Sequence, residues 1–325
     1  MPPPTVSIGL LAYNEERFIG KTIEALLAQD FTDFEVVVSD NCSTDRTPDI
    51  CRQYAARDPR LVYARNSRNV GSAGNVNAAF SRARGKYFIL ACGHDLWDPT
   101  LLSKCVAVLE SDPSVVLCYT DCAFIDEDDR VTVKLPRQVD TRGMNLRRRY
   151  NAVLWSLDCY AICGLHRTEA LRQALPMQPV IGPDNVVLSE LSMLGAFANI
   201  PEPLFLLRVF RTLGQMPAVW QRLLNRETRW WHVPGLFADF TRAFLAMVSR
   251  RAPTPSDRLY LSASTLLRLV RMIAGSLGML IGSTVFPRTY TRLTDWLVLR
   301  GRRRGPAAAP RDPADESGTL GGPPA

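Results

Sequence analysis

Apolar runs alternate with segments of helical periodicity over the first hundred residues of the chain. Four runs rich in aliphatic and β-branched residues predict strands, at residues 6–14, 34–41, 61–66 and 86–92. Three segments between them have helically spaced apolar residues or begin with capping residues, and they predict helices at residues 16–30, 43–59 and 69–85. This alternation predicts an α/β fold built on a doubly wound, mostly parallel sheet.

The rest of the chain has a less regular pattern, and residues 141–180 show no clear period. The further predicted elements are a strand at 115–126, a turn at 127–130, a helix at 186–197, an extended piece at 199–210 and helices from 217 onward. The expected parts are a catalytic domain at 1–212, a helical extension at 213–304 and a disordered tail rich in Pro, Gly and Ala at 305–325.

Polar clusters fall at three predicted strand ends: Asn14-Glu15, Asp40-Asn41 and His94-Asp95. In open α/β sheets, ligands bind beyond the carboxyl ends of the strands. One binding crevice therefore explains all three clusters, although each is also compatible with ordinary turn chemistry.

Charge and hydropathy bear on possible partners. The net charge is +7, and an arginine run at residues 300–304 could contact anionic lipid or nucleic acid, or simply face solvent.

The most apolar stretch lies at 265–286, but its arginine-free part, 272–286, spans 15 residues. A bilayer crossing needs about 20. A core helix or an interfacial membrane helix fits this stretch better.

Eight cysteines are present, without CxxC pairs or histidines at zinc-like spacing, which argues against a zinc site. Most lie in apolar runs, as expected of small buried side chains in a reducing compartment. The first residues, MPPPTVSIGLLAYNEE, lack the basic region of a signal peptide. We therefore expect a cytoplasmic protein.

The segment VSIGLLAYNEERFIGKTIEALLAQDFTDFEVVVSDNCSTDRT resembles the opening of family 2 glycosyltransferases. NVGSAGNVNAAFSRARGKYFILACGHDLWDPTLL is similar to the segment that leads into the metal motif of that family, and the resemblance resumes at IGPDNVVLSELSMLGAFANIPEPLFLLR. It implies the GT-A fold of nucleotide-diphospho-sugar transferases, with a C-terminal helical extension. The order and spacing of these motifs together are specific, although each alone is weak.

The resemblance implies a nucleotide site, with Asp40 accepting a hydrogen bond from the base or ribose. The other residues that it assigns to the nucleotide are Ala12, Tyr13, Asn14, Glu15, Asn41, Asn69, Gly71, Asn75, His94 and Arg208. The alternative is a purely structural role for these residues, in a turn, at a helix cap or at the surface.

The metal motif departs from the family pattern of acids. Cys92 and His94 stand where the family has carboxylates, and Asp95 alone is retained. Phe210 stands where the family commonly has a histidine, while Arg208 is retained. The resemblance implies Mg²⁺ or Mn²⁺, with Asp95 as ligand and His94 as its helper. A site that binds metal poorly, with basic residues substituting, is the alternative.

Asp184 aligns with the catalytic acid-motif aspartate of the family, which takes the proton of the acceptor hydroxyl. A helix N-cap is the alternative role for this residue.

The expected function is inverting transfer of a sugar from a nucleotide-diphosphate donor to a hydroxyl acceptor: a cell-envelope glycan, a lipid-linked glycan or a small molecule. We expect contact with a membrane surface, and we do not expect nucleic acid as a partner. A catalytically weak or inactive protein that binds a sugar nucleotide or a partner is the main alternative. A nucleotidyltransferase fits less well, because AYNEERFIGK is not a glycine- and lysine-rich phosphate loop.

Overall fold

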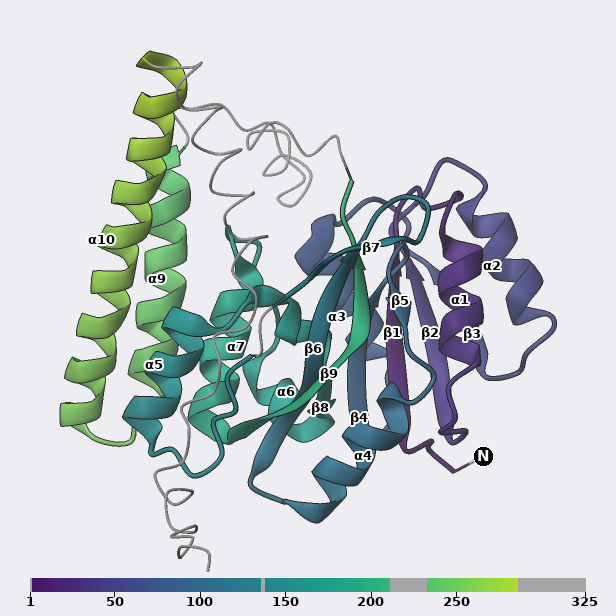
Figure 1. Cartoon of the computed structure of the whole chain (residues 1–325), viewed down its shortest axis with the longest axis horizontal. Helices are drawn as coiled ribbons and strands as arrows, with labels where there is room; N and C mark the ends of the chain where they lie inside the picture. Colours follow the sequence, from purple (N-terminus) through teal and green to yellow (C-terminus); the bar gives the residue numbers. More distant parts are fainter. Residues whose placement is uncertain (1, 136–137, 211–232, 286–325) are drawn as a thin grey trace, which may run out of the picture. The chain divides into compact units, whose positions relative to one another are not determined.

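The computed structural model of the chain describes residues 2–135, 138–210 and 233–285. Within these residues a single sheet of nine strands forms the centre (Figure 1), in the order β3-β2-β1-β4-β8-β6-β9-β5, with β7 paired to β6. The strands are β1 (Val6–Ala12), β2 (Phe34–Asp40), β3 (Leu61–Arg65), β4 (Tyr87–Cys92), β5 (Leu96–Trp97), β6 (Val115–Ile125), β7 (Val131–Lys134), β8 (Leu165–Arg167) and β9 (Ala196–Arg208).

The first four strands of that order, β3, β2, β1 and β4, are parallel to one another. All seven residues of β2 are buried, as expected of a strand covered on both faces. Strands β6 and β9 are also parallel, whereas β8 pairs antiparallel with β4 and β6. The predicted mostly parallel α/β sheet is therefore confirmed, and the carboxyl ends of β1, β2 and β4 meet at one edge.

The helices are α1 (Ile19–Leu27), α2 (Thr47–Ala55), α3 (Gly71–Ser81), α4 (Leu101–Ser111), α5 (Leu146–Ser156), α6 (Thr168–Ala174), α7 (Pro183–Leu194), α9 (Val233–Arg251), α10 (Pro255–Val285) and the 3-10 helix η1 (Cys159–Cys163). Several predicted helix boundaries were wrong; helix α1, for example, spans Ile19–Leu27 instead of 16–30. Helix α2 begins at Thr47 instead of 43, because residues 43–46 form a loop that contacts β2. Helix α7 begins at Pro183 instead of 186, because proline suits the first helical position.

The chain divides into two compact units, residues 1–274 and 275–325. In the first unit, α5, α7, α9 and the beginning of α10 share a second apolar core, which includes Tyr150, Phe240 and Phe244. Of the second unit, the structure describes only the end of α10. The boundary expected near residue 212 and the tail expected from 305 lie outside the described residues, as do residues 217–232 of the expected helical region.

Candidate nucleotide and acceptor site

The predicted polar clusters come together at the carboxyl edge of the parallel strands. The Asn41 N–H donates to the carbonyl of Ala12 over 2.8 Å, and the Gly93 N–H donates to the carbonyl of Leu11 over 2.9 Å. The segments that follow β1, β2 and β4 are therefore tied to one another directly beyond the sheet. Parallel register, and not sequence proximity, produces this grouping.

The β1–α1 loop is fastened to the β2–α2 loop through Asn14. Its backbone is left-handed, with φ of 57°, a conformation that asparagine tolerates better than most residues. Asn14 Oδ1 accepts from the Thr44 N–H at 2.8 Å, and the Asn14 N–H donates to Ser43 Oγ at 3.0 Å. The Glu15 N–H donates to Thr47 Oγ1 at 2.8 Å. These bonds leave the Glu15 side chain directed toward β4.

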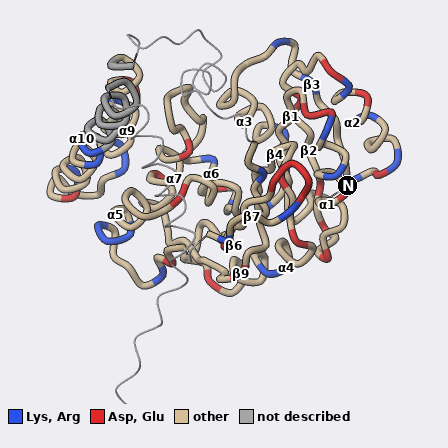
Figure 2. The backbone as a smooth tube through the Cα atoms, turned by 45° about the horizontal axis from the view of Figure 1, so that its top comes forward, with Lys and Arg blue, Asp and Glu red and all other residues tan. Residues whose placement is uncertain are grey.

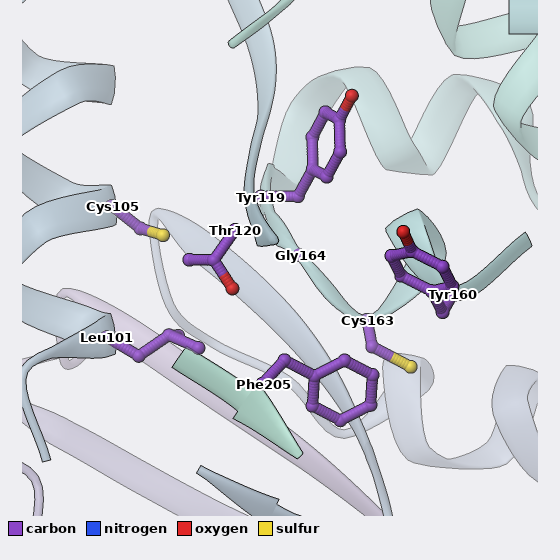
Figure 3. Close-up of a pocket in the computed structure, with 8 residues that line it drawn as sticks. All are labelled: Leu101, Cys105, Tyr119, Thr120, Tyr160, Cys163, Gly164 and Phe205. Carbon is purple, nitrogen blue, oxygen red and sulfur yellow. The ribbon is translucent and has the colours of Figure 1, made fainter. Parts of the chain in front are cut away.

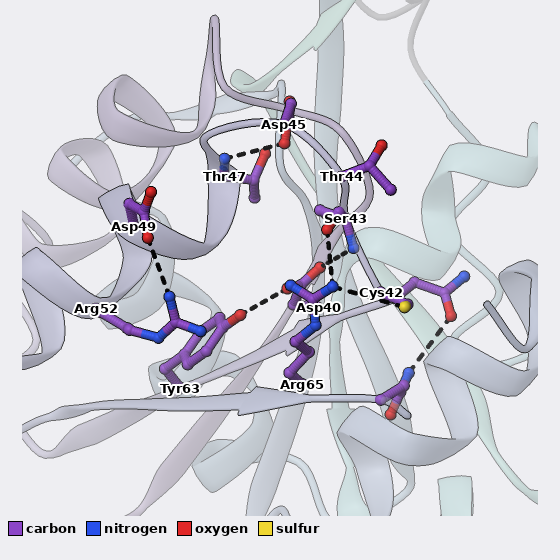
Figure 4. A network of polar contacts seen from close by, with 12 residues as sticks. Asp40, Cys42, Ser43, Thr44, Asp45, Thr47, Asp49, Arg52, Tyr63 and Arg65 are labelled. Carbon is purple, nitrogen blue, oxygen red and sulfur yellow. Dashed lines mark hydrogen bonds and ion pairs between the residues drawn. The ribbon is translucent and has the colours of Figure 1, made fainter. Parts of the chain in front are cut away.

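Asp40 is fully buried at the end of β2, and its carboxylate is held on three sides (Figure 4). Oδ1 accepts from the Ser43 N–H at 2.9 Å, and Oδ2 accepts from the Tyr63 hydroxyl at 2.6 Å. The Arg65 guanidinium lies 3.6 Å from Oδ2. A nucleotide that contacts Asp40 would share it with these groups. Tyr63 and Arg65 were not predicted, since nothing in the sequence of β3 marks them as partners of Asp40.

Three asparagines connect the end of β2 to the beginning of α3. Asn41 Nδ2 donates to Asn69 Oδ1 at 2.8 Å, and Asn69 Oδ1 also accepts from the Gly71 N–H at 2.9 Å. Asn75 Nδ2 donates to the Ser39 carbonyl at 3.0 Å. Gly71 has φ of 76°, which favours glycine at this turn. These predicted nucleotide residues are thus grouped, and each has a structural role in the loop.

His94 is held against Glu15, with its Nδ1 2.9 Å from Glu15 Oε1. The other ring nitrogen, Nε2, lies 4.0 Å from Asp95 Oδ1. Burial alone would lower the pKa of His94, but the hydrogen bond that its Nδ1–H donates to Glu15, with the nearby Asp95, outweighs burial and raises the pKa to about 9. The imidazole therefore carries a positive charge at neutral pH, between two carboxyl groups.

Asp95 is almost completely buried at the beginning of the segment after β4. Desolvation raises the pKa of its carboxyl to about 6, against the opposing influence of His94 and of the Arg208 N–H. That N–H donates to Asp95 Oδ1 at 2.8 Å, and the Thr22 hydroxyl donates to the Asp95 carbonyl at 3.0 Å. The residue is fixed by both α1 and the end of β9.

Arg208 is also buried, with its guanidinium directed at protein oxygens. Nε donates to the His94 carbonyl at 2.7 Å, and the Nη atoms contact the Asp126 carbonyl and the Asp129 carboxylate. Asp129 belongs to the turn between β6 and β7 and also contacts Lys21. In this arrangement Arg208 orients the His94-Asp95 segment, and a phosphate contact would require it to leave these partners.

Phe210, at the position where the family commonly has a histidine, packs against His94. Their ring centroids lie 5.2 Å apart in an edge-to-face arrangement, and Phe18 lies 5.6 Å from Phe210 on the other side. The guanidinium of Arg208 lies over the Phe18 ring at 4.5 Å. An apolar contact thus stands where the family has an imidazole.

Asp184 lies in the first turn of α7, and Gly182 occupies the N-cap position with a left-handed φ of 58°. The predicted alternative role of Asp184 as N-cap is therefore wrong. Desolvation raises the pKa of its carboxyl to about 6. Within the described residues, no hydrogen bond or ion pair engages this carboxylate. A carboxyl group of this kind can accept a proton near neutral pH.

Asp184 and Asp95 both act on the thiol of Cys163 in η1. The hydrogen-bonded Cys92 thiol and burial raise the pKa of Cys163, and the charges of Asp95 and Asp184 add to the effect. The predicted base and the predicted metal ligand are thus both near one buried thiol. The sequence did not indicate this, because residues 141–180 lacked a readable period.

Among the described residues, the carboxylate of Asp95 is the side chain that could bind a divalent cation. No group of three or more His, Cys, Asp or Glu side chains in the described ranges is arranged to hold a metal. Asp95 Oδ2 has no hydrogen bond within the same residues, and Mg²⁺ is often held by one or two carboxylates plus phosphate oxygens and water. His94 has no lone pair for a metal while both ring nitrogens are protonated.

Two cavities among the described residues are too small for a nucleotide. One, lined by Tyr119, Tyr160, Cys163, Phe205 and their neighbours, has room for no more than about one water molecule (Figure 3). A second, beside His166, is of similar size.

Solved structures of similar fold define the class. TarS of S. aureus, solved with UDP, matches 81% of this chain and 70% of its own at a TM-score of 0.60 and 18% identity. The mannosyltransferase PcManGT from Pyrobaculum calidifontis, solved with GDP-Man and Mn²⁺, matches 92% of this chain and 81% of its own at a TM-score of 0.51 and 18% identity. The fold is the GT-A fold expected from the sequence.

The family follows from sequence similarity. Glycosyl transferase family 2 matches residues 7–174, just over half of the chain, and the chain belongs to this family. An uncharacterized glycosyltransferase of Nostoc sp., alr2836, is 28% identical over 66% of this chain and 67% of its own. WfaP of Escherichia coli, named as a UDP-Glc:alpha-D-GlcNAc-diphosphoundecaprenol beta-1,3-glucosyltransferase, is 32% identical over 39% of this chain and 49% of its own.

An uncharacterized protein of Mycobacterium tuberculosis is 37% identical over 135 residues. This match covers 40% of the present chain and 39% of the mycobacterial protein. The chain therefore spans about two fifths of the length of that relative.

Proposed function

We propose that the protein is an inverting glycosyltransferase that moves a sugar from a nucleotide-diphosphate donor to a hydroxyl acceptor. The observation that carries this proposal is Asp184: a desolvated carboxylate with a pKa raised to about 6, in a chain of glycosyl transferase family 2. Solved neighbours of the same fold hold UDP, UDP-GlcNAc or GDP-Man, which supports a nucleotide-sugar donor.

In the proposed reaction, Asp184 takes the proton of the acceptor hydroxyl as its oxygen attacks the anomeric carbon. The bond between that carbon and the phosphate oxygen breaks, and the nucleoside diphosphate leaves. Because one displacement forms the new bond, the anomeric configuration inverts. Desolvation supports this role for Asp184, since a base works best when its pKa is near the operating pH.

The nucleotide is proposed to bind at the edge formed by Ala12 to Glu15, Asp40-Asn41 and Asn69 to Asn75. The carboxylate of Asp40 would accept a hydrogen bond from an imide N–H or a ribose hydroxyl. That bond would replace the one donated by the Tyr63 hydroxyl or by the Ser43 N–H. The protonated His94 would face the diphosphate, and Arg208 would hold the His94-Asp95 segment in place.

Asp95 is the proposed protein ligand of Mg²⁺ or Mn²⁺, together with the donor diphosphate. When bound, such an ion would neutralise charge on the departing nucleotide. The Mn²⁺ in PcManGT supports this assignment. Because His94 is paired with Glu15, we assign it to charge compensation and not to the metal.

A protein that binds a sugar nucleotide but turns it over poorly is the second candidate. It is favoured by Cys92, His94 and Phe210, which replace ligating side chains of the family pattern near Asp95. Cytoplasmic placement is also a proposal, supported by the eight cysteines, which are all free and most of which are buried.

Slow donor hydrolysis tests both candidates without knowledge of the acceptor. Purified protein would be incubated with UDP-, GDP- and dTDP-sugars in Mg²⁺, Mn²⁺ or EDTA, and release of nucleoside diphosphate measured. The proposal expects metal-stimulated release that Asp95→Asn abolishes, whereas Asp45→Asn, in the neighbouring loop, serves as the control for a nearby lost carboxylate. Donor binding without release, with or without an acceptor extract, would support the second candidate.

A further inference from the structure

Helix α10 has two apolar faces between Arg258 and Arg271. Leu261, Thr265 and Leu269 are buried against the protein. On the opposite side stand large side chains that remain exposed, namely Leu259, Leu266, Leu267 and Val270, together with Tyr260 at the border toward α5, where its hydroxyl accepts from Asn151 Nδ2 at 2.7 Å. At 3.6 residues per turn, these five occupy an arc of about 120° centred opposite the buried residues. We call these five residues the outer arc.

The inner face of α10 is fixed on α5 by specific bonds. The Tyr150 hydroxyl lies 2.6 Å from Thr265 Oγ1, and Trp155 Nε1 donates to Ser264 Oγ at 3.2 Å. Arg147 Nε donates to Asp257 Oδ1 at 2.8 Å. Rotation of the helix about its axis would break these bonds, so the outer arc cannot be buried by turning inward. The described part of the chain leaves it exposed.

The outer arc is large and strongly exposed. Leu259, Leu267 and Val270 are 74%, 62% and 64% exposed. Single exposed apolar residues are common, but a contiguous row of large ones on one helix face indicates an interaction surface.

Charge around the outer arc identifies the kind of partner. Residues 258–271 include three arginines and no acid. The guanidinium groups of Arg268 and Arg271 lie over the Trp155 ring at 5.6 and 6.0 Å, along one border of the arc. Arg148 is exposed on the neighbouring helix α5, and Figure 2 marks the arginines of α5 and α10 in blue.

An apolar face bordered by arginines fits an anionic bilayer surface better than a second copy of the chain. A symmetric self-contact would bring the same arginine-rich border against itself, which costs electrostatic free energy. Anionic headgroups instead attract each nearby arginine by about 1 kcal/mol. None of the helices in the described part of the chain has the length and apolar character to cross a membrane.

We propose that the outer arc of α10 docks on the surface of an anionic lipid bilayer, with its leucines and valine at the boundary between headgroups and acyl chains. The helix would lie along the surface, as interfacial amphipathic helices do. A consequence, which rests on the proposed transferase function, is that the acceptor is carried by a lipid and reaches the site at this surface.

Vesicle flotation of the full chain tests the docking surface. Vesicles would contain phosphatidylcholine alone or phosphatidylcholine with about one third phosphatidylglycerol. The wild type is expected to float with the anionic vesicles, and Leu267→Glu/Val270→Glu to bind at least tenfold less. Val62→Glu/Val131→Glu is the matched control, because it adds the same two charges at exposed valines on β3 and β7. Leu259→Gln/Leu267→Gln tests the apolar contribution without added charge.

Three results would overturn the proposal. One is equal flotation of the outer-arc variants and the control. Another is absence of wild-type binding to anionic vesicles. The third is a dimer by light scattering that the outer-arc variants convert to monomer without any vesicle binding, since the arc would then be a self-contact. The assay contains neither donor nor acceptor, so failure of the proposed transfer reaction leaves its outcome unaffected.

Discussion

His94 Nδ1 lies 2.9 Å from Oε1 of Glu15, across the edge where β1 and β4 end. This pair joins a glutamate that the sequence resemblance assigned to the base pocket with a histidine at an altered position of the metal motif. Because the pairing keeps the imidazole protonated, it supplies a positive charge close to Asp95. The pair therefore places a positive charge in the metal motif, where the family pattern has carboxylates.

Replacement of Glu15 by glutamine removes the charge that stabilises the His94 imidazolium. We expect Glu15→Gln to lower the pKa of His94 clearly below about 9. NMR titration of the imidazole signals measures this directly, and the chain has only three histidines. Glu16→Gln is the control, since its carboxylate accepts from the Arg46 N–H instead. An unchanged His94 pKa in Glu15→Gln would show that the pairing is absent in solution.

The raised pKa of Asp184 sets the expected pH dependence of transfer. A general base works only when deprotonated, so kcat/KM should rise with pH through about 6 and level off above it. Asp184→Asn should lower kcat by about 10²- to 10⁴-fold and remove that ionisation from the profile. Initial rates between pH 4.5 and 8.5 provide the measurement. A profile that keeps the same ionisation in a residually active Asp184→Asn variant would assign the base to another group.

Cys42 carries a left-handed backbone, with φ of 66°, a conformation that favours glycine. A side chain there costs about 1–2 kcal/mol of steric free energy, partly offset by the smaller unfolded-state entropy of a non-glycine residue. We expect Cys42→Gly to raise the free energy of unfolding by about 0.5–1 kcal/mol in urea denaturation. Cys42→Ala removes the thiol but keeps the Cβ, so it should not stabilise. Equal effects of the two substitutions would assign the change to the thiol instead.

His166 is completely buried in β8, with Nε2 2.9 Å from the Ile162 carbonyl and no partner for Nδ1 among the described residues. Burial lowers its pKa to about 4. Between pH 6.5 and 4, His166 is therefore protonated in the unfolded chain but neutral in the folded protein. The free energy of unfolding should fall over this interval by about 3 kcal/mol on account of this residue.

The comparison with His166→Asn isolates that effect. Asp95 and Asp184 have raised pKa values and contribute in the opposite direction between pH 6 and 3.8, equally in both proteins. On acidification from pH 6.5 to 4, the free energy of unfolding of the wild type should therefore fall by about 3 kcal/mol relative to that of the variant. Parallel pH dependences would mean that His166 is protonated in the folded protein.

Much of the sheet could be predicted because its strands are locally readable. Buried parallel strands such as β2 and β4 are continuous apolar runs, and polar residues mark where they end. The order of the motifs also located Asp95 and Asp184. The boundary of α7 was predicted three residues too late, because Gly182 and Pro183 carry the capping and first-turn functions that were considered for Asp184.

The contacts that define the chemistry could not be predicted, because they join distant segments. Tyr63 reaches Asp40 from a neighbouring strand, and Asp129 reaches Arg208 from a turn about 80 residues earlier. The spacing of apolar and polar residues along the sequence does not indicate such partners. The same holds for η1, whose Cys163 comes near both Asp95 and Asp184 only through tertiary packing.

The central claim is that this chain transfers glycosyl groups with Asp184 as the base. The most direct test measures donor binding and nucleoside diphosphate release by the same preparations of wild type, Asp184→Asn and Asp49→Asn. Asp49 is a first-turn aspartate of α2 paired with Arg52, so it matches the helix position without the proposed role. We predict that all three bind donor, and that only Asp184→Asn loses release. Equal release by Asp184→Asn and the wild type would contradict the account.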